Sequence, residues 1–274
     1  GALAVLGPTV TLLVDSTTFL IAIDFLWGLP VIRAEKGEMN RDTRGNAVAR
    51  AFRNMAMELK ESVHIAREDR VLLGAVLAKF PLSLASGGSW VLLNLVSEDA
   101  ALLGGGGLVL GLLHSVRGIG TGLGPWWAAG QIERGRFGDE RGRDVAAWVA
   151  LLSMALFAAL AHGALGWWPM VFVTVFFWGI GTGTNWVLST AAIQRIASDQ
   201  VMGRVTALDF FLATSGLALG AVIAALAADW TGEPVAAGAA SVLVGSVSWL
   251  LAKRLAKGGK AKDAELGTVP SWCE

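Results

Sequence analysis

The chain has 274 residues, of which 54% are hydrophobic and only 16% are charged, and its mean hydropathy is +0.57. A soluble domain of this length could not bury so much apolar surface, so the composition favours a membrane protein over a soluble one. The net charge is zero and no stretch alternates basic with aromatic residues, which gives no reason to expect a nucleic-acid partner. The single cysteine, Cys273, excludes an internal disulfide and a cysteine metal cluster.

Seven apolar segments are long enough to cross a bilayer, because about 20 helical residues span a hydrocarbon core of roughly 30 Å. The clearest stretch, 146–194, contains no charged residue and is interrupted only by HGALGWWP at 162–169, which predicts two membrane helices joined by a short turn. The alternative, a pair of buried helices in a large soluble core, is disfavoured because similar runs recur along the chain. The predicted spans are 10–32, 71–97, 102–130, 146–166, 170–193, 206–228 and 235–252.

Basic residues occur in alternate gaps between these spans, and those gaps hold 20 of the 22 Lys and Arg residues. The other two, Lys79 and Arg117, lie inside spans. By the positive-inside rule the basic gaps and the C-terminus are cytoplasmic, which predicts a multi-pass protein of the plasma (inner) membrane, in contact with the lipid bilayer. The basic gaps are 33–70, 131–144, 194–205 and 253–262.

The beginning of the chain fits this topology poorly. Seven crossings place residue 1 outside the cell, yet the chain begins with Gly1 and shows no cleavable signal pattern. We therefore expect a fragment, in which residues 1–33 form a membrane helix of an otherwise missing N-terminal half. The alternative is a mature seven-helix product of processing.

The segment 34–70 predicts a cytoplasmic linker that contains an amphipathic helix, followed by a six-helix membrane unit at 71–254. Apolar residues recur at steps of three and four between Val48 and Ala66, with charged residues between them. Such a helix lies on a membrane surface or, alternatively, binds a partner. The stretch EKGEMNRDTRGN before it is typical of a flexible connection, and the tail 255–274 is predicted to be disordered and cytoplasmic.

This order of elements resembles the second half of a major facilitator superfamily transporter. ELKESVHIAREDRVLL at 58–73 is similar to the linker before the seventh helix of the exporter-like branch, which includes siderophore and drug exporters. MGRVTALDFFLATSGLALGAVIAALAADWTG at 202–232 is similar to the eleventh helix of that branch. The resemblance implies that spans two to four and five to seven are inverted repeats around a central site.

The resemblance also implies a cytoplasmic gate loop between the third and fourth spans. The family carries an acidic residue followed by basic residues and glycine there, and GQIERGRFGDERGR at 130–143 matches that signature loosely. Glu133, Arg134 and Arg136 would hold the gate-stabilising ion pairs. The alternative, which we favour, is a solvated turn whose charges only obey the positive-inside rule.

Glycines are frequent in three of the spans. GIGTGLGP at 118–125 ends the third span, GIGTGTN at 179–185 lies in the fifth, and Gly216 and Gly220 lie in the sixth. None of these stretches has the spacing of a nucleotide-binding loop, and no Walker pattern is present, so no cofactor is expected. Small residues four apart instead let helix backbones approach closely, and we predict helix packing as their role.

Arg117 is the most informative charged residue, because it lies near the middle of its span. A guanidinium that cannot lose its proton needs an anion, backbone carbonyls or cavity water at that depth. His114 and Thr121 share its helix face. We interpret this face as part of a central cavity in which Arg117 binds an anionic group of a substrate, or else pairs with a buried carboxylate.

Few carboxylates are available for such a pair or for carrying a proton. Asp24 lies deep in the first span, whereas Asp209 is expected in the first turn of its helix, where stabilising the helix N-terminus is the favoured role. Lys79 lies near the cytoplasmic end of its span, and we expect its ammonium to reach that surface. Asp24, Asp209 and Lys79 nevertheless join Arg117, His114 and Thr121 as candidates for a substrate or proton pathway.

The sequence gives little support to catalysis. No Gly-x-Ser-x-Gly, His-Glu-x-x-His or paired-carboxylate motif occurs, and the three histidines are far apart, so neither an enzyme nor a metal site is expected. The function implied by the resemblance is secondary active transport, namely proton-coupled export of a small molecule by alternating access. The alternative is a polytopic membrane scaffold without transport activity, or an interfacial membrane enzyme.

Overall fold

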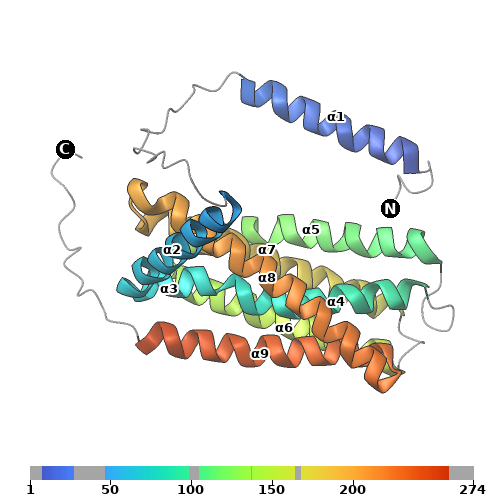
Figure 1. Ribbon diagram of the computed structural model, residues 1–274. Coiled ribbons are helices and arrows are strands. Elements are labelled where there is room, and N and C mark those ends of the chain that lie inside the picture. Colours follow the sequence, from blue (N-terminus) through green and yellow to red (C-terminus); the bar gives the residue numbers. More distant parts are fainter. Residues whose placement is uncertain (1–7, 28–46, 99–104, 137, 164–167, 259–274) are drawn as a thin grey trace.

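The computed structural model describes residues 8–27, 47–98, 105–136, 138–163 and 168–258, and all regular structure within them is α-helical (Figure 1). Each of the seven predicted spans corresponds to a helix, although α3 and α4 share the second span. The helices are α1 (Pro8–Trp27), α2 (Ala47–Glu68), α3 (Arg70–Leu77), α4 (Lys79–Glu98), α5 (Gly106–Glu133), α6 (Asp139–Gly163), α7 (Trp168–Ile196), α8 (Asp199–Thr231) and α9 (Pro234–Gly258).

Two prolines have opposite effects on the helices that contain them. Pro81 lacks the N–H group that an uninterrupted helix would bond to the carbonyl of Leu77, which explains why α3 and α4 are separated at Ala78. Pro125, in contrast, lies inside α5, which continues past it to Glu133. The helix thus ends within three residues of the predicted end of the third span, residue 130, and GIGTGLGP lies inside it.

Among the described residues, five helical stretches are long and apolar enough to cross a membrane, which is compatible with a multi-pass membrane protein. The helices α1 and α5 are not among the five, so that seven crossings remain a prediction. The five stretches are Arg70–Glu98, Asp139–His162, Pro169–Ile196, Asp199–Thr231 and Val235–Lys257.

Helices α4 to α9 form two interlocked triplets, α4 to α6 and α7 to α9. The first helix of each triplet packs most extensively on the second and third helices of the other triplet, so α4 contacts α8 and α9 while α7 contacts α5 and α6. Figure 1 shows that α4 and α7 run in opposite directions. If α4, α5 and α6 are exchanged with α7, α8 and α9, the contacts of α4 with α8 and α9 become the contacts of α7 with α5 and α6. This is the arrangement expected of an inverted repeat.

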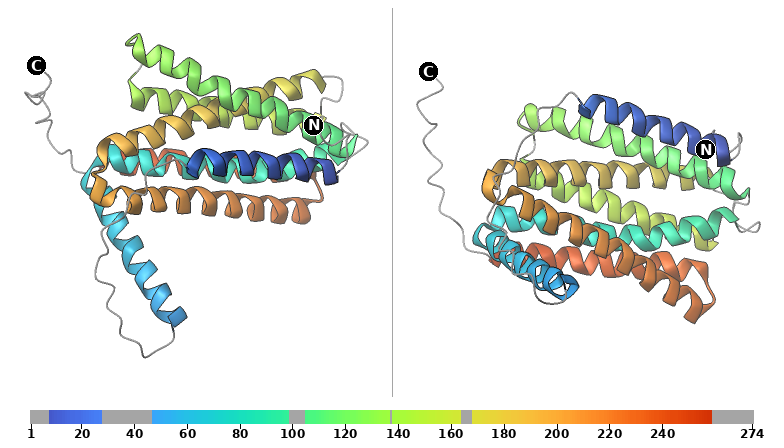
Figure 2. Two further views of the ribbon diagram at one scale, coloured as in Figure 1. Left: turned by 90° about the horizontal axis from the view of Figure 1, so that it is seen from above. Right: turned by 45° about the horizontal axis from the view of Figure 1, so that its top comes forward.

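The basic gaps meet at one end of the bundle, which we call the basic end. The chain enters α3 there, passes between α5 and α6 and between α7 and α8, and leaves α9 (Figure 1). The helix α2 also lies at this end and projects away from the bundle at a steep angle (Figure 2). Its buried Ser62 and Ala66 pack toward α3 and α8. The amphipathic helix predicted in the linker is thus confirmed as a helix.

The predicted boundaries need one correction. The helix α9 continues to Gly258, so the tail predicted to be disordered from residue 255 begins inside a helix. Residues 259–274 and the connection EKGEMNRDTRGN lie outside the described residues. Within those that are described, α1 makes no close contact with another helix, and its large apolar side chains, such as Phe25, are exposed.

Candidate functional site

A cavity of about 260 Å³ lies among four helices, α4, α5, α7 and α8, and none of its lining residues comes from α6 or α9. We call it the central cavity. It brings together three of the predicted site residues, Lys79, Arg117 and Thr121. Thr121 and Thr214 are exposed, so the cavity opens to one side of the bundle. Its lining is Lys79, Leu82, Ser83, Ser86, Trp90, Arg117, Thr121, Thr182, Gly183, Asn185, Trp186, Ala213, Thr214 and Leu217.

Glycines allow the helices around this cavity to approach backbone to backbone. A Cβ added to Gly179 of α7 would overlap the carbonyl oxygen of Arg117, and one added to Gly183 would overlap that of Thr121. On the other side, a Cβ at Gly220 of α8 would overlap the carbonyl oxygen of Leu84. These contacts confirm the predicted packing role, because no larger residue fits there without moving a backbone.

The glycines of α5 divide between two faces of the helix. An added Cβ would meet the α7 backbone at Gly120 and Gly124, whereas it would meet nothing within 4 Å at Gly118 and Gly122. Of the four glycines in GIGTGLGP, Gly120 and Gly124 therefore take part in the close approach of α5 to α7, and Gly118 and Gly122 do not.

Arg117 rests against aromatic rings rather than against an acid. Its guanidinium carbon lies 5.1 Å from the ring centroid of Trp90 and 5.0 Å from that of Trp178. Both distances are within the range of a cation–π interaction. No described carboxylate lies within ion-pair distance of Arg117. Its side chain is partly buried at the cavity wall, so the charge is available to an anion in the cavity.

The neighbours of Arg117 on α5 behave differently from each other. The Thr121 hydroxyl donates a hydrogen bond to the Arg117 carbonyl over 2.9 Å, and Thr121 lines the cavity. His114 is exposed and does not line it, although its ring meets that of Trp90 edge-on at a centroid distance of 6.3 Å. The structure therefore places Thr121 beside Arg117 in the cavity and leaves His114 on its periphery.

Lys79 is the second cation of the cavity, and it is paired. Its Nζ lies 2.5 Å from Oδ2 of Asp209, and each side chain is 1% exposed. The same ammonium donates to the hydroxyl of Thr190 over 2.8 Å and lies 4.4 Å from the ring centroid of Trp186. Our expectation that Lys79 reaches the cytoplasmic surface is wrong, because an ion pair and an aromatic ring hold it inside the bundle.

The position of Asp209 also differs from the predicted one. The helix α8 begins at Asp199, ten residues earlier, so Asp209 is deep in the helix and does not stabilise its N-terminus. Its Oδ2 accepts from Lys79, while its Oδ1 is buried without a hydrogen-bond partner among the described residues. A buried carboxylate oxygen without a donor is costly, and it marks a place where a proton could bind.

Asp24, the other predicted acid, does not reach the cavity. It is exposed on α1, which contacts none of the other described helices. Asp209 is thus the carboxylate that contacts the cavity lining, and its partner there is Lys79 rather than Arg117.

At the basic end, the three residues of the predicted gate loop form no ion pair with another described residue. Glu133 ends α5, Arg134 follows it, and Arg136 donates to the side-chain oxygen of Gln131 over 3.1 Å. The ion pairs at this end join other helices. They are Arg195 with Asp139, Lys253 with Asp144, and Arg204 with Glu61.

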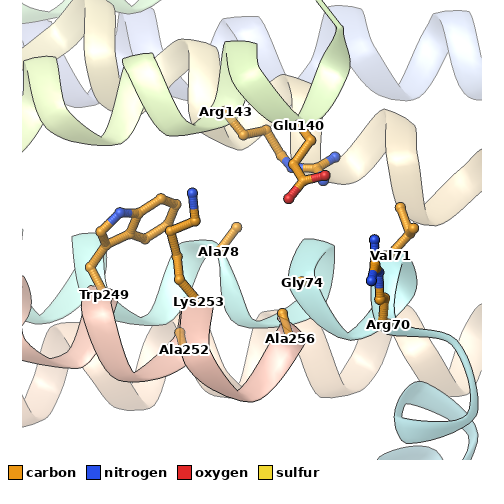
Figure 3. Close-up of a pocket in the computed structure, with 10 residues that line it drawn as sticks. All are labelled: Arg70, Val71, Gly74, Ala78, Glu140, Arg143, Trp249, Ala252, Lys253 and Ala256. Carbon is orange, nitrogen blue, oxygen red and sulfur yellow. The ribbon is translucent and has the colours of Figure 1, made fainter. Parts of the chain in front are cut away.

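A small space beside these pairs is lined by charged residues of α3, α6 and α9. Figure 3 shows Arg143, Glu140 and Lys253 pointing into it, with Trp249 at one side. Its volume is about 60 Å³, against about 260 Å³ for the central cavity. This space therefore fits a contact between helices better than a substrate site, and Arg143, which is 4% exposed, is part of that contact.

Three residues that contact the two cations are absent from the predicted site residues. They are Trp90 and Trp178 beside Arg117, and Thr190 beside Lys79, and only the fold brings them there. Within the described residues no cluster of three or more His, Cys, Asp or Glu side chains could hold a metal ion.

Comparisons of the chain with protein-family models, with curated proteins and with solved structures give no significant match. The resemblance to a major facilitator transporter therefore rests on the quoted sequence stretches alone.

Proposed function

We propose that this chain forms one half of a major facilitator type secondary transporter, which exports a small molecule by alternating access and is coupled to protons. The observation that carries the proposal is the central cavity, in which Arg117 has no acidic partner among the described residues. A permanent charge inside a membrane is expensive, so an ionisable residue there marks a substrate or ion pathway.

The cavity chemistry supports an anionic substrate with an apolar or aromatic part. Lys79 is neutralised by Asp209, which leaves the charge of Arg117 to attract an anion. The rings of Trp90 and Trp186 and the hydroxyls of Ser83 and Thr214 line the same space. A few polar groups on an apolar wall are typical of small-molecule sites.

The pair of Lys79 and Asp209 is the proposed coupling element. When a proton binds Asp209, the ion pair to Lys79 is lost, and α4 and α8 no longer share that attraction. The extensive contacts between the two triplets support movement of the six helices as one body, which would rock against the missing N-terminal half around the cavity. Protonation would then shift the balance between two orientations of the halves.

Transport in lipid vesicles tests the proposal. The chain would be reconstituted together with a complementary N-terminal half, and the flux of organic anions would be followed under an imposed proton gradient. We expect gradient-driven flux, which Arg117→Gln abolishes because it removes the charge that attracts the anion. The control is Arg53→Gln, which removes an exposed charge of α2 far from the cavity.

Two results would contradict the proposal. A folded preparation that transports none of the organic anions tested would favour the alternative of a membrane scaffold without transport activity. Normal flux in Arg117→Gln would show that the cavity does not bind substrate through this residue.

A further inference from the structure

A second hollow, outside the central cavity, lies at the basic end between α2, α3, α8 and α9. Its volume is about 490 Å³, within the range of roughly 300–1,000 Å³ for ligand sites. We call it the cationic groove. Its lining is Val63, Ala66, Arg67, Leu73, Val76, Leu77, Leu208, Leu212, Arg254 and Leu255.

The charge of the cationic groove has one sign. Arg67 from α2 and Arg254 from α9 are its charged lining residues, both are exposed, and neither has an ion-pair partner among the described residues. Of the acids on α2, Glu61 pairs with Arg204, and neither Glu61 nor Glu68 lines the groove. The groove is therefore complementary to an anion at its rim.

The remaining lining is apolar, and it follows helices that can span a membrane. Leu73, Val76 and Leu77 come from the first of these stretches, Leu208 and Leu212 from α8, and Leu255 from α9. Leu255 is exposed although it is large and apolar. A ligand for this surface needs one apolar part along the helices and one anionic part at the two arginines.

The position of the groove gives it access to such a ligand. The helix α2 projects from the basic end of the bundle (Figure 2) and contributes Val63, Ala66 and Arg67 to the lining of the groove. With the basic end facing the cytoplasm, as the positive-inside rule predicts, the arginines lie at the level of the cytoplasmic headgroups. That leaflet contains anionic phospholipids, and basic pockets between membrane helices bind their headgroups.

We propose that the cationic groove binds one anionic phospholipid, with its phosphate between Arg67 and Arg254 and an acyl chain against Leu77, Leu208 and Leu212. The bound lipid joins α2 to α8 and α9, so it holds the amphipathic helix against the bundle. This site does not depend on the proposed transport activity, because it lies outside the central cavity.

Native mass spectrometry of the purified full chain in detergent tests the site. The protein would be titrated with dioleoyl phosphatidylglycerol and, separately, with dioleoyl phosphatidylcholine, which has the same acyl chains. We expect one phosphatidylglycerol to bind at least ten-fold more tightly than phosphatidylcholine. Arg67→Gln together with Arg254→Gln should weaken phosphatidylglycerol binding by about twenty-five-fold, because each basic residue contributes about a five-fold factor.

Two controls separate this site from general attraction. Arg53→Gln together with Arg134→Gln removes the same charge from exposed positions outside the groove and should leave binding within two-fold. Leu212→Trp fills the apolar part of the groove and should weaken the binding of both lipids. Leu219→Trp, at an exposed position farther along α8, should not.

Three outcomes would overturn the proposal. Equal affinity for the two lipids would exclude headgroup recognition, and an equal loss in the control pair of arginine variants would show attraction without a site. Competition by soluble glycerol phosphate as strong as that by the lipid, with no effect of Leu212→Trp, would assign the arginines to a free phosphate instead.

Discussion

The central cavity contains two basic side chains, and the two sides of the bundle accommodate them in different ways. On the side of α4 and α8, Lys79 is 1% exposed and its charge is neutralised by Asp209. On the side of α5 and α7, Arg117 is partly exposed and lies against two tryptophan rings. It has no acidic partner among the described residues. Lys79 therefore stabilises the fold through its ion pair, whereas the charge of Arg117 is available to bind a ligand.

The two sides have the same backbone packing, which makes the difference informative. Gly220 of α8 lies against the carbonyl of Leu84 in α4, just as Gly120 of α5 lies against the carbonyl of Phe176 in α7. The α4–α8 and α5–α7 interfaces thus have the same type of glycine contact with a backbone carbonyl. They differ in charge, because Lys79 is paired with an acid and Arg117 is not. The distribution of charge, rather than the helix packing, distinguishes the proposed coupling side from the proposed substrate side.

The largest expected effect is on the paired side. Asp209→Leu leaves the Lys79 ammonium buried without its counter-charge, which costs about 3–5 kcal/mol in proteins. The double variant Lys79→Met with Asp209→Leu should recover most of this loss, because neither charge is then buried alone. Reversible unfolding in mixed detergent micelles measures both free energies. A double variant no more stable than the single one would show that the pair is not the reason for the loss.

The glycine contacts are expected to give the next largest effect. Gly120→Ala and Gly220→Ala each push a methyl group into a facing backbone carbonyl, and overpacking of this kind costs about 1–3 kcal/mol. Gly118→Ala is the matched control on α5, since nothing lies within 4 Å of its added Cβ. We expect it to be neutral or to stabilise the helix by about 0.5–1 kcal/mol.

The same unfolding assay measures all three glycine variants. Similar losses at Gly120 and Gly220 would support the equivalence of the two interfaces. A loss at only one of them would mean that the triplets do not pack equivalently.

Removing the unpaired cation should cost less than breaking the pair. Arg117→Gln loses two contacts with aromatic rings, and a cation–π interaction is worth about 0.5–1 kcal/mol when exposed and about 2 kcal/mol when desolvated. We therefore expect thermal unfolding of this variant near that of the wild type, in contrast to Asp209→Leu. A loss as large as that of Asp209→Leu would show that Arg117 is structural, and its proposed role with substrate would fall with that result.

The sequence predicted the positions of the helices better than it predicted their partners. Long runs without charge identify spans directly, and glycines four residues apart identify close packing, because both signals are local. The pair of Lys79 and Asp209 joins positions 130 residues apart, and only the contact between α4 and α8 brings them together. From the sequence alone, the position of Lys79 near the end of an apolar run predicted that its ammonium reaches the cytoplasmic surface, which is wrong.

The start of α8 was misplaced for a related reason. Apolar patterning begins several residues after Asp199, because the first turns of α8 carry charged side chains such as Arg204, which pairs with Glu61 of α2. The predicted span from residue 206 omitted those turns and moved Asp209 to the helix end. A hydropathy signal reports the part of a helix that contacts lipid or core, and polar turns beyond it need their tertiary partners to be recognised.

The smallest expected effect concerns those partners at the basic end. The pair of Arg204 and Glu61 is partly exposed, and pairs of this kind contribute about 0.2–1 kcal/mol. Arg204→Gln should therefore lower stability slightly at low salt, and the difference from the wild type should vanish near 1 M salt, where charges are screened within about 3 Å. The loss in Asp209→Leu should persist at the same salt, because its pair is shielded from ions by the bundle. Equal salt sensitivity of the two variants would place both pairs in contact with solvent and remove the contrast between a buried coupling pair and a surface one.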